Sequence, residues 1–229
     1  DVEKQDPITY KFKASSIDTN YTKSEEFFEK SSKIRGSIML MGPLVARFGN
    51  AYLAKPGGDK IGRRRVDTHF IGIQELGAKF TSEKNNSLFK VSSEKLHGSN
   101  ILLDEASVTG TANIVMAAAL AEGKTTIYNA ACEPYLQQLC KMLNSMGANI
   151  KGVGSNFLKI EGVSNLIGTR HKILPDMIEI GSFIGLAAMT QSDILIKNVS
   201  TENLGIIPKT FSRLGIKMSL ENDSIHIPS

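Results

Sequence analysis

Tryptophan is missing from this chain of 229 residues, cysteine occurs only twice, and aromatic residues make up 7%. Two cysteines cannot build the disulfide framework that stabilises small secreted domains. The few scattered aromatics and the mild net charge of +4 argue against a nucleic-acid partner, which requires a broad basic stripe with stacking side chains. Hydrophobic residues (41%) and charged residues (22%) nevertheless occur in ordinary proportions, so we expect a globular fold rather than disorder.

Long apolar runs are also missing. No run approaches the roughly 20 residues that a membrane-spanning helix needs, so no membrane partner is expected. The first residues, DVEKQDPITYKFK, are polar and contain no apolar signal segment. Because no initiator methionine opens the chain, it is expected to be a processed or excised piece.

The two cysteines and the four histidines predict neither a disulfide nor a metal site. Cys132 and Cys140 lie on a segment expected to be helical, which places their Cα atoms about 12 Å apart. We expect both to be buried, reduced thiols in a cytoplasmic protein. The histidines are dispersed and match no metal-ligand spacing, so we expect no metal and no cofactor.

Three similar segments of about 70 residues follow one another along the chain. Each contains a helix that is expected to end at a glycine: Gly77, Gly147 or Gly215. Glycine adopts the left-handed conformation of a helix C-terminus without strain. A pair of strands should follow each glycine, and its second strand is expected at 88–92, 157–163 or 224–227.

Each segment also holds an earlier helix that is apolar around most of its circumference. Such a helix is expected to be buried on nearly every face, whereas the later helices at 135–146 and 203–214 look amphipathic. The apolar helices are expected at 36–48, 111–121 and 179–190, and the strands that follow them at 51–53, 125–129 and 193–198.

These patterns predict an α/β fold of three strand–helix repeats, with the apolar helices clustered inside and the sheets outside. A doubly wound sandwich is disfavoured because no strand leads directly into a GxGxxG turn. No low-complexity linker divides the chain, so we expect one domain over 1–229. It would comprise an entry strand and helix at 1–33 and repeats at about 34–98, 99–165 and 166–229.

The segment 55–69, KPGGDKIGRRRVDTH, is the densest functional signal. Its Pro-Gly-Gly turn offers unhindered backbone N–H groups, and Arg63, Arg64 and Arg65 offer guanidinium groups, as a phosphate-bearing ligand requires. Asp67 is expected near the start of the next helix. A solvent-exposed hairpin with internal ion pairs would explain the same residues.

A second candidate is the segment 104–113, DEASVTGTAN, which precedes a buried helix. Ser107 or Thr109 is expected to cap the helix, and the free N–H groups of the first turn could bind an anion. Capping alone would also explain this pattern. Arg35 stands at the corresponding helix start of the first repeat.

Five stretches, in order and with few gaps, carry a resemblance to a known family. They are RGSI at 35–38, MGPLVARFG at 41–49, PGGDKIGRR at 56–64, the run from SVTGTAN to NAACEP at 107–134, and LPDMIEIGSFIGLAA at 174–188. From about residue 34 to its end the chain resembles the UDP-N-acetylglucosamine enolpyruvyl transferases.

The resemblance implies a cytoplasmic bacterial enzyme that transfers the enolpyruvyl group of phosphoenolpyruvate to the 3′-hydroxyl of UDP-N-acetylglucosamine and releases phosphate. This reaction is the first committed step of peptidoglycan synthesis. The family has two domains, each an inside-out α/β barrel of three strand–helix repeats with pseudo-threefold symmetry and buried helices. This chain resembles one domain only, because the family's residues from the second domain have no counterpart in it.

The resemblance also implies roles for individual residues. Asp59 stands where the family usually has a cysteine that acts as the general acid, and Arg64 and Arg35 match arginines that contact substrate. The residues that match the segments holding the uridine and diphosphate are Arg65, Val66, Asp67, Thr68, Glu105, Ala106, Ser107 and Val108, with Thr109 adjoining.

Three departures from the family pattern matter. Asp59 replaces the cysteine that fosfomycin alkylates, so we expect resistance, since a carboxylate does not attack the epoxide as a thiolate does. Arg65 replaces a common proline and Glu105 a common lysine, so contacts to the nucleotide should differ in detail. Two alternatives remain: a domain of the 3-phosphoshikimate enolpyruvyl transferase, or a non-catalytic module of this fold that binds nucleotide sugars or RNA ends.

Overall fold

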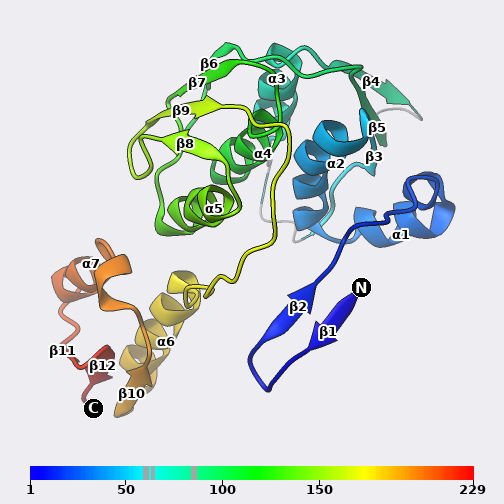
Figure 1. Ribbon diagram of the computed structural model, residues 1–229. Helices are drawn as coiled ribbons and strands as arrows, with labels where there is room; N and C mark the ends of the chain where they lie inside the picture. Colours follow the sequence, from blue (N-terminus) through cyan, green and yellow to red (C-terminus); the bar gives the residue numbers. More distant parts are fainter. Residues whose placement is uncertain (59–61, 63–64, 84–86) are drawn as a thin grey trace. The chain divides into compact units, whose positions relative to one another are not determined.

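A computed structural model describes residues 1–58, 62, 65–83 and 87–229 of the chain (Figure 1). These residues form two compact units, Asp1–Gly168 and Thr169–Ser229, and each is described by itself. The expectation of one domain stays a prediction. None of the helices in the described part of the chain is long and apolar enough to cross a membrane.

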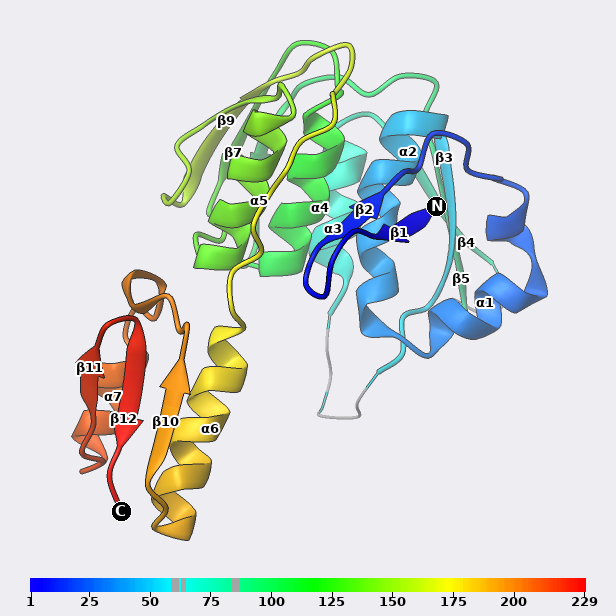
Figure 2. The same cartoon turned by 60° about the horizontal axis from the view of Figure 1, so that its bottom comes forward.

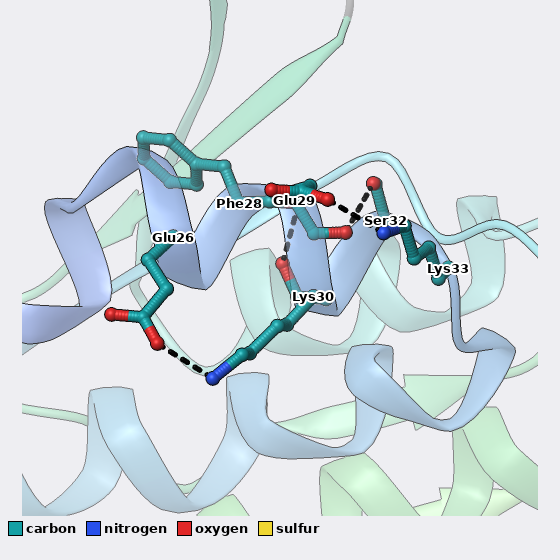
Figure 3. Close-up of polar contacts among 7 residues, drawn as sticks. Glu26, Phe28, Glu29, Lys30, Ser32 and Lys33 are labelled. Atoms are coloured by element: carbon teal, nitrogen blue, oxygen red, sulfur yellow. Dashed lines mark hydrogen bonds and ion pairs between the residues drawn. The ribbon is translucent and has the colours of Figure 1, made fainter.

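The N-terminal residues form a hairpin and a short helix rather than the single strand and helix expected. Strands β1 (Val2–Lys4) and β2 (Tyr10–Phe12) pair antiparallel and are exposed. After the 3₁₀ turn η1 (Tyr21–Lys23), helix α1 (Glu25–Ser32) carries the ion pairs Glu26–Lys30 and Glu29–Lys33, each 2.6 Å long (Figure 3). Pairs at this spacing support a solvent-exposed helix.

The first repeat follows the predicted order, but its apolar helix is divided. Residues 36–48 were expected to form one α-helix, whereas the structure has a 3₁₀ helix, η2 (Arg35–Leu40), followed by α2 (Met41–Phe48). Pro43 explains the division, because proline has no N–H to donate and is tolerated only in the first turn of an α-helix. The remaining elements are β3 (Asn50–Ala54), α3 (Asp67–Glu75), β4 (Lys79–Glu83) and β5 (Leu88–Ser92).

The second repeat contains the most deeply buried helix. Every residue of α4 (Val108–Ala118) from Gly110 onward is buried except Met116. This helix packs against α2, α3 and α5, which surround it within the first unit (Figure 2). The other elements are β6 (Asn100–Leu102), β7 (Lys124–Tyr128), α5 (Pro134–Ser145), β8 (Asn149–Lys151) and β9 (Phe157–Glu161).

The third repeat forms the second unit, and its apolar helix departs from the prediction. Helix α6 (Met177–Thr190) was expected to be buried on nearly every face, but it buries one stripe, while Phe183 and Met189 are exposed. The reason is that a single small sheet and α7 supply its cover within this unit. The other elements are β10 (Ile194–Lys197), η3 (Thr201–Asn203), α7 (Ile207–Arg213), β11 (Ser219–Glu221) and β12 (Ser224–Ile227).

The sheets of the three predicted repeats share a three-stranded pattern, to which the second sheet adds β6, parallel to β7. In each repeat the strand after the first helix pairs antiparallel with the last strand, and the last two strands form a hairpin. The strand orders are β3-β5-β4, β6-β7-β9-β8 and β10-β12-β11. Gly77, Gly147 and Gly215 all have positive φ angles, as predicted for glycines that end helices.

One cysteine prediction was wrong. Cys140 is buried in α5, where burial raises the pKa of its thiol to about 11. Cys132, however, is exposed, because it lies before α5 begins and not on the helix face that enters the core. Both thiols are free, as expected.

Candidate ligand site at the starts of helices α3 and α4

The glycine turn at 57–58 lies directly against Arg35. A Cβ atom on Gly57 would overlap the carbonyl oxygen of Ser32, and one on Gly58 would lie 3.1 Å from the Cβ of Arg35. Gly58 also has a φ of +91°, which side-chain-bearing residues rarely adopt. The turn therefore needs both glycines to lie this close to Ser32 and Arg35.

Arg35 in turn holds the segment that precedes α3. Its Nη2 donates a 2.8 Å hydrogen bond to the carbonyl oxygen of Arg65. The guanidinium group of Arg65 is turned toward Asp67, with 2.7 Å between Nε and Oδ2. This hydrogen bond and the charge of Asp67 raise the pKa of Arg65, and the more distant carboxylates of Glu105 and Asp104 add to the effect.

The starts of α3 and α4 are in direct contact. Thr68 is buried in the first turn of α3, and its hydroxyl donates to Oε1 of Glu105 at 3.2 Å. A Cβ on Gly110, in the first turn of α4, would lie 2.9 Å from Cγ2 of Thr68. The structure thus brings together the two segments that the family resemblance assigned to one ligand, although 37 residues separate Thr68 from Glu105.

Ser107, one of the two residues predicted to cap α4, is the cap. Its Oγ accepts a 3.1 Å hydrogen bond from the backbone N–H of Gly110. Ala106 is exposed, whereas Val108 packs partly against the core, as Val66 does before α3. The remaining N–H groups of this first turn favour an anion through the helix dipole.

Two residues of the site have no counterpart among the predicted ones. His69 is 1% exposed and Asn113 is 0% exposed, and the two side chains meet between Nδ1 and Nδ2 at 2.9 Å. Burial, followed by the positive charge of Arg35, lowers the pKa of His69 to about 4. The available sequence signal was a single amide within an apolar helix, since a buried polar group needs partners.

The arrangement suits an anionic ligand. It combines the guanidinium group of Arg35, the first turn of α4 and the hydroxyl of the exposed residue Thr109, and phosphate oxygens accept hydrogen bonds from donors of these kinds. Asp59 and Arg64, the predicted acid and its neighbouring arginine, lie outside the described residues. Across the ranges that the structure describes, no three His, Cys, Asp or Glu side chains gather as metal ligands would.

Comparison with known proteins identifies the family. The sequence model of the EPSP synthase (3-phosphoshikimate 1-carboxyvinyltransferase) family matches residues 11–227. Two curated bacterial relatives are both named UDP-N-acetylglucosamine 1-carboxyvinyltransferase. The one from Bacteroides fragilis is 66% identical over 96% of this chain and 51% of its own length. The one from Porphyromonas gingivalis is 62% identical over 95% of this chain and 50% of its own length.

The fold agrees with this result. The crystal structure of the enolpyruvyl transferase NikO from Streptomyces tendae matches 85% of this chain and 47% of its own, with a TM-score of 0.70 and 16% sequence identity. The chain spans about half the length of the curated relatives that it matches. The resemblance drawn from the sequence motifs is therefore confirmed.

Proposed function

Because this chain belongs to the EPSP synthase (3-phosphoshikimate 1-carboxyvinyltransferase) family, we propose that it is part of a bacterial cytoplasmic UDP-N-acetylglucosamine enolpyruvyl transferase. The enzyme transfers the enolpyruvyl group of phosphoenolpyruvate to the 3′-hydroxyl of UDP-N-acetylglucosamine in peptidoglycan synthesis. The observation that carries the proposal is the contact between the two nucleotide segments at Thr68 and Glu105. The names of the relatives support the same substrate.

In the proposed reaction, Asp59 donates a proton to the methylene carbon of phosphoenolpyruvate. The adjacent carbon becomes an oxocarbenium-like centre, and the 3′-oxygen of the sugar forms a bond to it. The hydroxyl proton is then lost to a base, the carbon–oxygen bond to phosphate breaks, and a proton leaves the methyl carbon to restore the enol ether. Arg64 and Arg35 stabilise the phosphate charge.

Several described residues would hold the nucleotide sugar. The backbone of Arg65 to Thr68 and the start of α4 at Glu105 to Thr109 provide N–H groups and hydroxyls for the uridine and diphosphate. Glu105 is already bonded to Thr68, so its carboxylate supports the junction between the segments rather than contacting phosphate. Carboxylate and phosphate charges repel each other, which favours this division of roles.

The finer description of the fold belongs to the same proposal. We infer that the three repeats form one inside-out α/β barrel with pseudo-threefold symmetry, and that a second domain of the longer enzyme completes the site. The shared topology of the three sheets supports it. Calorimetry tests the inference: one domain should unfold in a single transition, whereas two separate transitions would contradict it.

Ligand titration tests the substrate. We expect the chain to bind UDP-N-acetylglucosamine in preference to shikimate 3-phosphate or a short RNA, and preference for either of these would overturn the proposal in favour of the corresponding alternative. Arg35→Ala should weaken binding of the nucleotide sugar. Arg47→Ala is the matched control, because Arg47 is exposed on α2 and donates to the carbonyl of Ala14 instead.

A further inference from the structure

A buried amide with one possible orientation lies behind the start of α4. Asn113 accepts a 2.7 Å hydrogen bond at Oδ1 from the backbone N–H of Gly42. Its Nδ2 donates a 2.8 Å hydrogen bond to the carbonyl oxygen of Ile38. A backbone N–H can only donate and a carbonyl can only accept, so these two contacts determine which end of the amide carries oxygen.

This orientation determines the state of His69. The second hydrogen of the Asn113 amide points at Nδ1 of His69, 2.9 Å away, so Nδ1 must accept and cannot carry a proton. The imidazole is therefore neutral and carries its hydrogen on Nε2. Nε2 lies 3.2 Å from Oγ1 of Thr109, and its N–H donates to that oxygen.

The consequence reaches the surface at Thr109. Thr109 is exposed in the first turn of α4, two residues after the cap at Ser107. Because its oxygen accepts from the imidazole, its own hydrogen does not point at the ring and is available to another acceptor. A hydroxyl held in this way on an exposed residue offers a donor to a ligand at the helix start.

We propose that Asn113 and His69 are positioning residues, which orient the Thr109 hydroxyl as a hydrogen-bond donor to a phosphate oxygen of a diphosphate-bearing ligand. The identity of that ligand rests on the proposed function. Neither positioning residue touches the ligand, and each acts through its neighbour in the order Asn113, His69, Thr109. The chain of contacts joins α2, α3 and α4, so packing of the core sets the donor's direction.

The surroundings of the ring agree with a neutral imidazole. His69 is enclosed in the first unit, and Arg35 is the charged group that acts on it. A protonated ring would place an N–H against the amide hydrogens of Asn113. A positive charge there would also be repelled by the guanidinium group of Arg35.

The first test measures the tautomer directly. Nitrogen NMR of the imidazole in the unliganded chain at about pH 7 distinguishes a protonated Nε2 from a protonated Nδ1. We expect hydrogen on Nε2 alone, and Asn113→Leu should remove this preference. Hydrogen on Nδ1, or averaging over both nitrogens in the unmodified chain, would overturn the proposal.

The second test measures affinity by calorimetric titration with UDP-N-acetylglucosamine and, separately, with inorganic pyrophosphate. Thr109→Val should weaken binding about tenfold, as expected for loss of a hydrogen bond to a charged acceptor. Thr109→Ser keeps the hydroxyl and should bind within about twofold of the unmodified chain. Equal affinity for the valine and serine variants would overturn the proposal.

A double-mutant cycle separates positioning from a merely structural role. His69→Leu should weaken binding as Thr109→Val does, with no further loss when the two are combined. His69→Gln, which keeps an N–H donor at the end of the side chain, should recover part of the affinity. If His69→Leu weakens binding as much in the Thr109→Val variant as it does in the unmodified chain, His69 does not act through Thr109. If His69→Leu does not fold, as judged by thermal unfolding, His69→Gln takes its place in the cycle.

The two ligands distinguish this inference from the proposed function. If UDP-N-acetylglucosamine binds and its affinity is the same in Thr109→Val as in the unmodified chain, the inference is refuted and the proposed function is not. Binding of pyrophosphate through Thr109 without binding of the nucleotide sugar would support the inference and refute the proposed substrate. Binding of neither ligand to the unmodified chain would refute both.

Discussion

Gly42 and Asn113 are joined where α2 crosses α4: the backbone N–H of Gly42 donates to Oδ1 of Asn113 at 2.7 Å. A Cβ atom on Gly42 would overlap both the backbone oxygen and the amide oxygen of Asn113. The two helices approach this closely because glycine has no side chain at the crossing. The contact also anchors the amide that faces His69.

Gly42→Ala should therefore destabilise the chain. The added methyl group forces the two helices apart, and overpacking of this kind costs about 1–3 kcal/mol in the free energy of unfolding. Gly36→Ala is the matched control, because a Cβ there would meet only Cγ2 of Ile34, at 3.8 Å. Urea unfolding of both variants checks the prediction, and equal midpoints would contradict it.

The stability of the fold should depend on the protonation of His69. The folded chain binds this proton only below its pKa of about 4, whereas the unfolded chain binds it below about 6.5. Between these pH values the unfolded state binds more protons than the folded state. The contribution of the neutral His69 to the free energy of unfolding is therefore fully present above pH 6.5 and decreases as the pH falls toward about 4. We expect a loss of about 2 kcal/mol between about pH 7 and pH 5.

Urea unfolding across that pH range measures the effect. The range lies above the acid titration of exposed carboxylates such as Glu29, whose pKa the neighbouring Lys33 lowers. His69→Gln should flatten the pH dependence, because glutamine does not titrate in this range. If the free energy of unfolding of His69→Gln depends on pH as strongly as that of the unmodified chain, another group is responsible.

Two buried threonines should respond oppositely to replacement by valine. Oγ1 of Thr111 accepts a 3.1 Å hydrogen bond from the backbone N–H of Ala131, so Thr111→Val leaves that buried N–H unpaired. The expected cost is about 1–3 kcal/mol. Oγ1 of Thr125 is buried without a hydrogen-bond partner among the described residues, so Thr125→Val should be neutral or stabilising. Thermal unfolding of the pair compares them directly, and a similar loss in both would contradict the assignment.

Asp59→Asn should abolish turnover in the longer enzyme that includes the proposed second domain. Loss of a general acid lowers the rate by about 10²–10⁴-fold, while binding of UDP-N-acetylglucosamine should be nearly unchanged. Arg64→Ala should impair both turnover and binding. Unchanged turnover in Asp59→Asn would disprove the assignment of the acid.

The same enzyme should resist fosfomycin, because a carboxylate does not open the epoxide as a thiolate does. Asp59→Cys should introduce sensitivity while keeping activity, which makes it the matched comparison. Time-dependent loss of turnover measures the reaction. Inactivation of the unmodified enzyme at low concentrations of the drug would disprove the prediction.

Local patterns along the chain were enough to predict three helix ends and the position of one helix cap. Gly77, Gly147 and Gly215 end helices because their left-handed φ angles exclude most other residues, and this requirement is visible wherever glycine follows a helical pattern. Ser107 was also a predictable cap, because its hydroxyl accepts a hydrogen bond from a backbone N–H only three residues away. Pro43, by contrast, divides a helix that its apolar pattern alone would continue.

The sequence by itself was enough to identify the α/β class and the family and to predict two segments of the candidate site, because each rests on patterns of neighbouring residues along the chain. Only the tertiary structure decided that Thr68 meets Glu105 and that Asn113 meets His69, which is 44 residues away. A buried amide or imidazole must find its partners in space, and several pairings satisfy the same sequence. The packing of α2, α3 and α4 selects one of them, and with it the tautomer of His69.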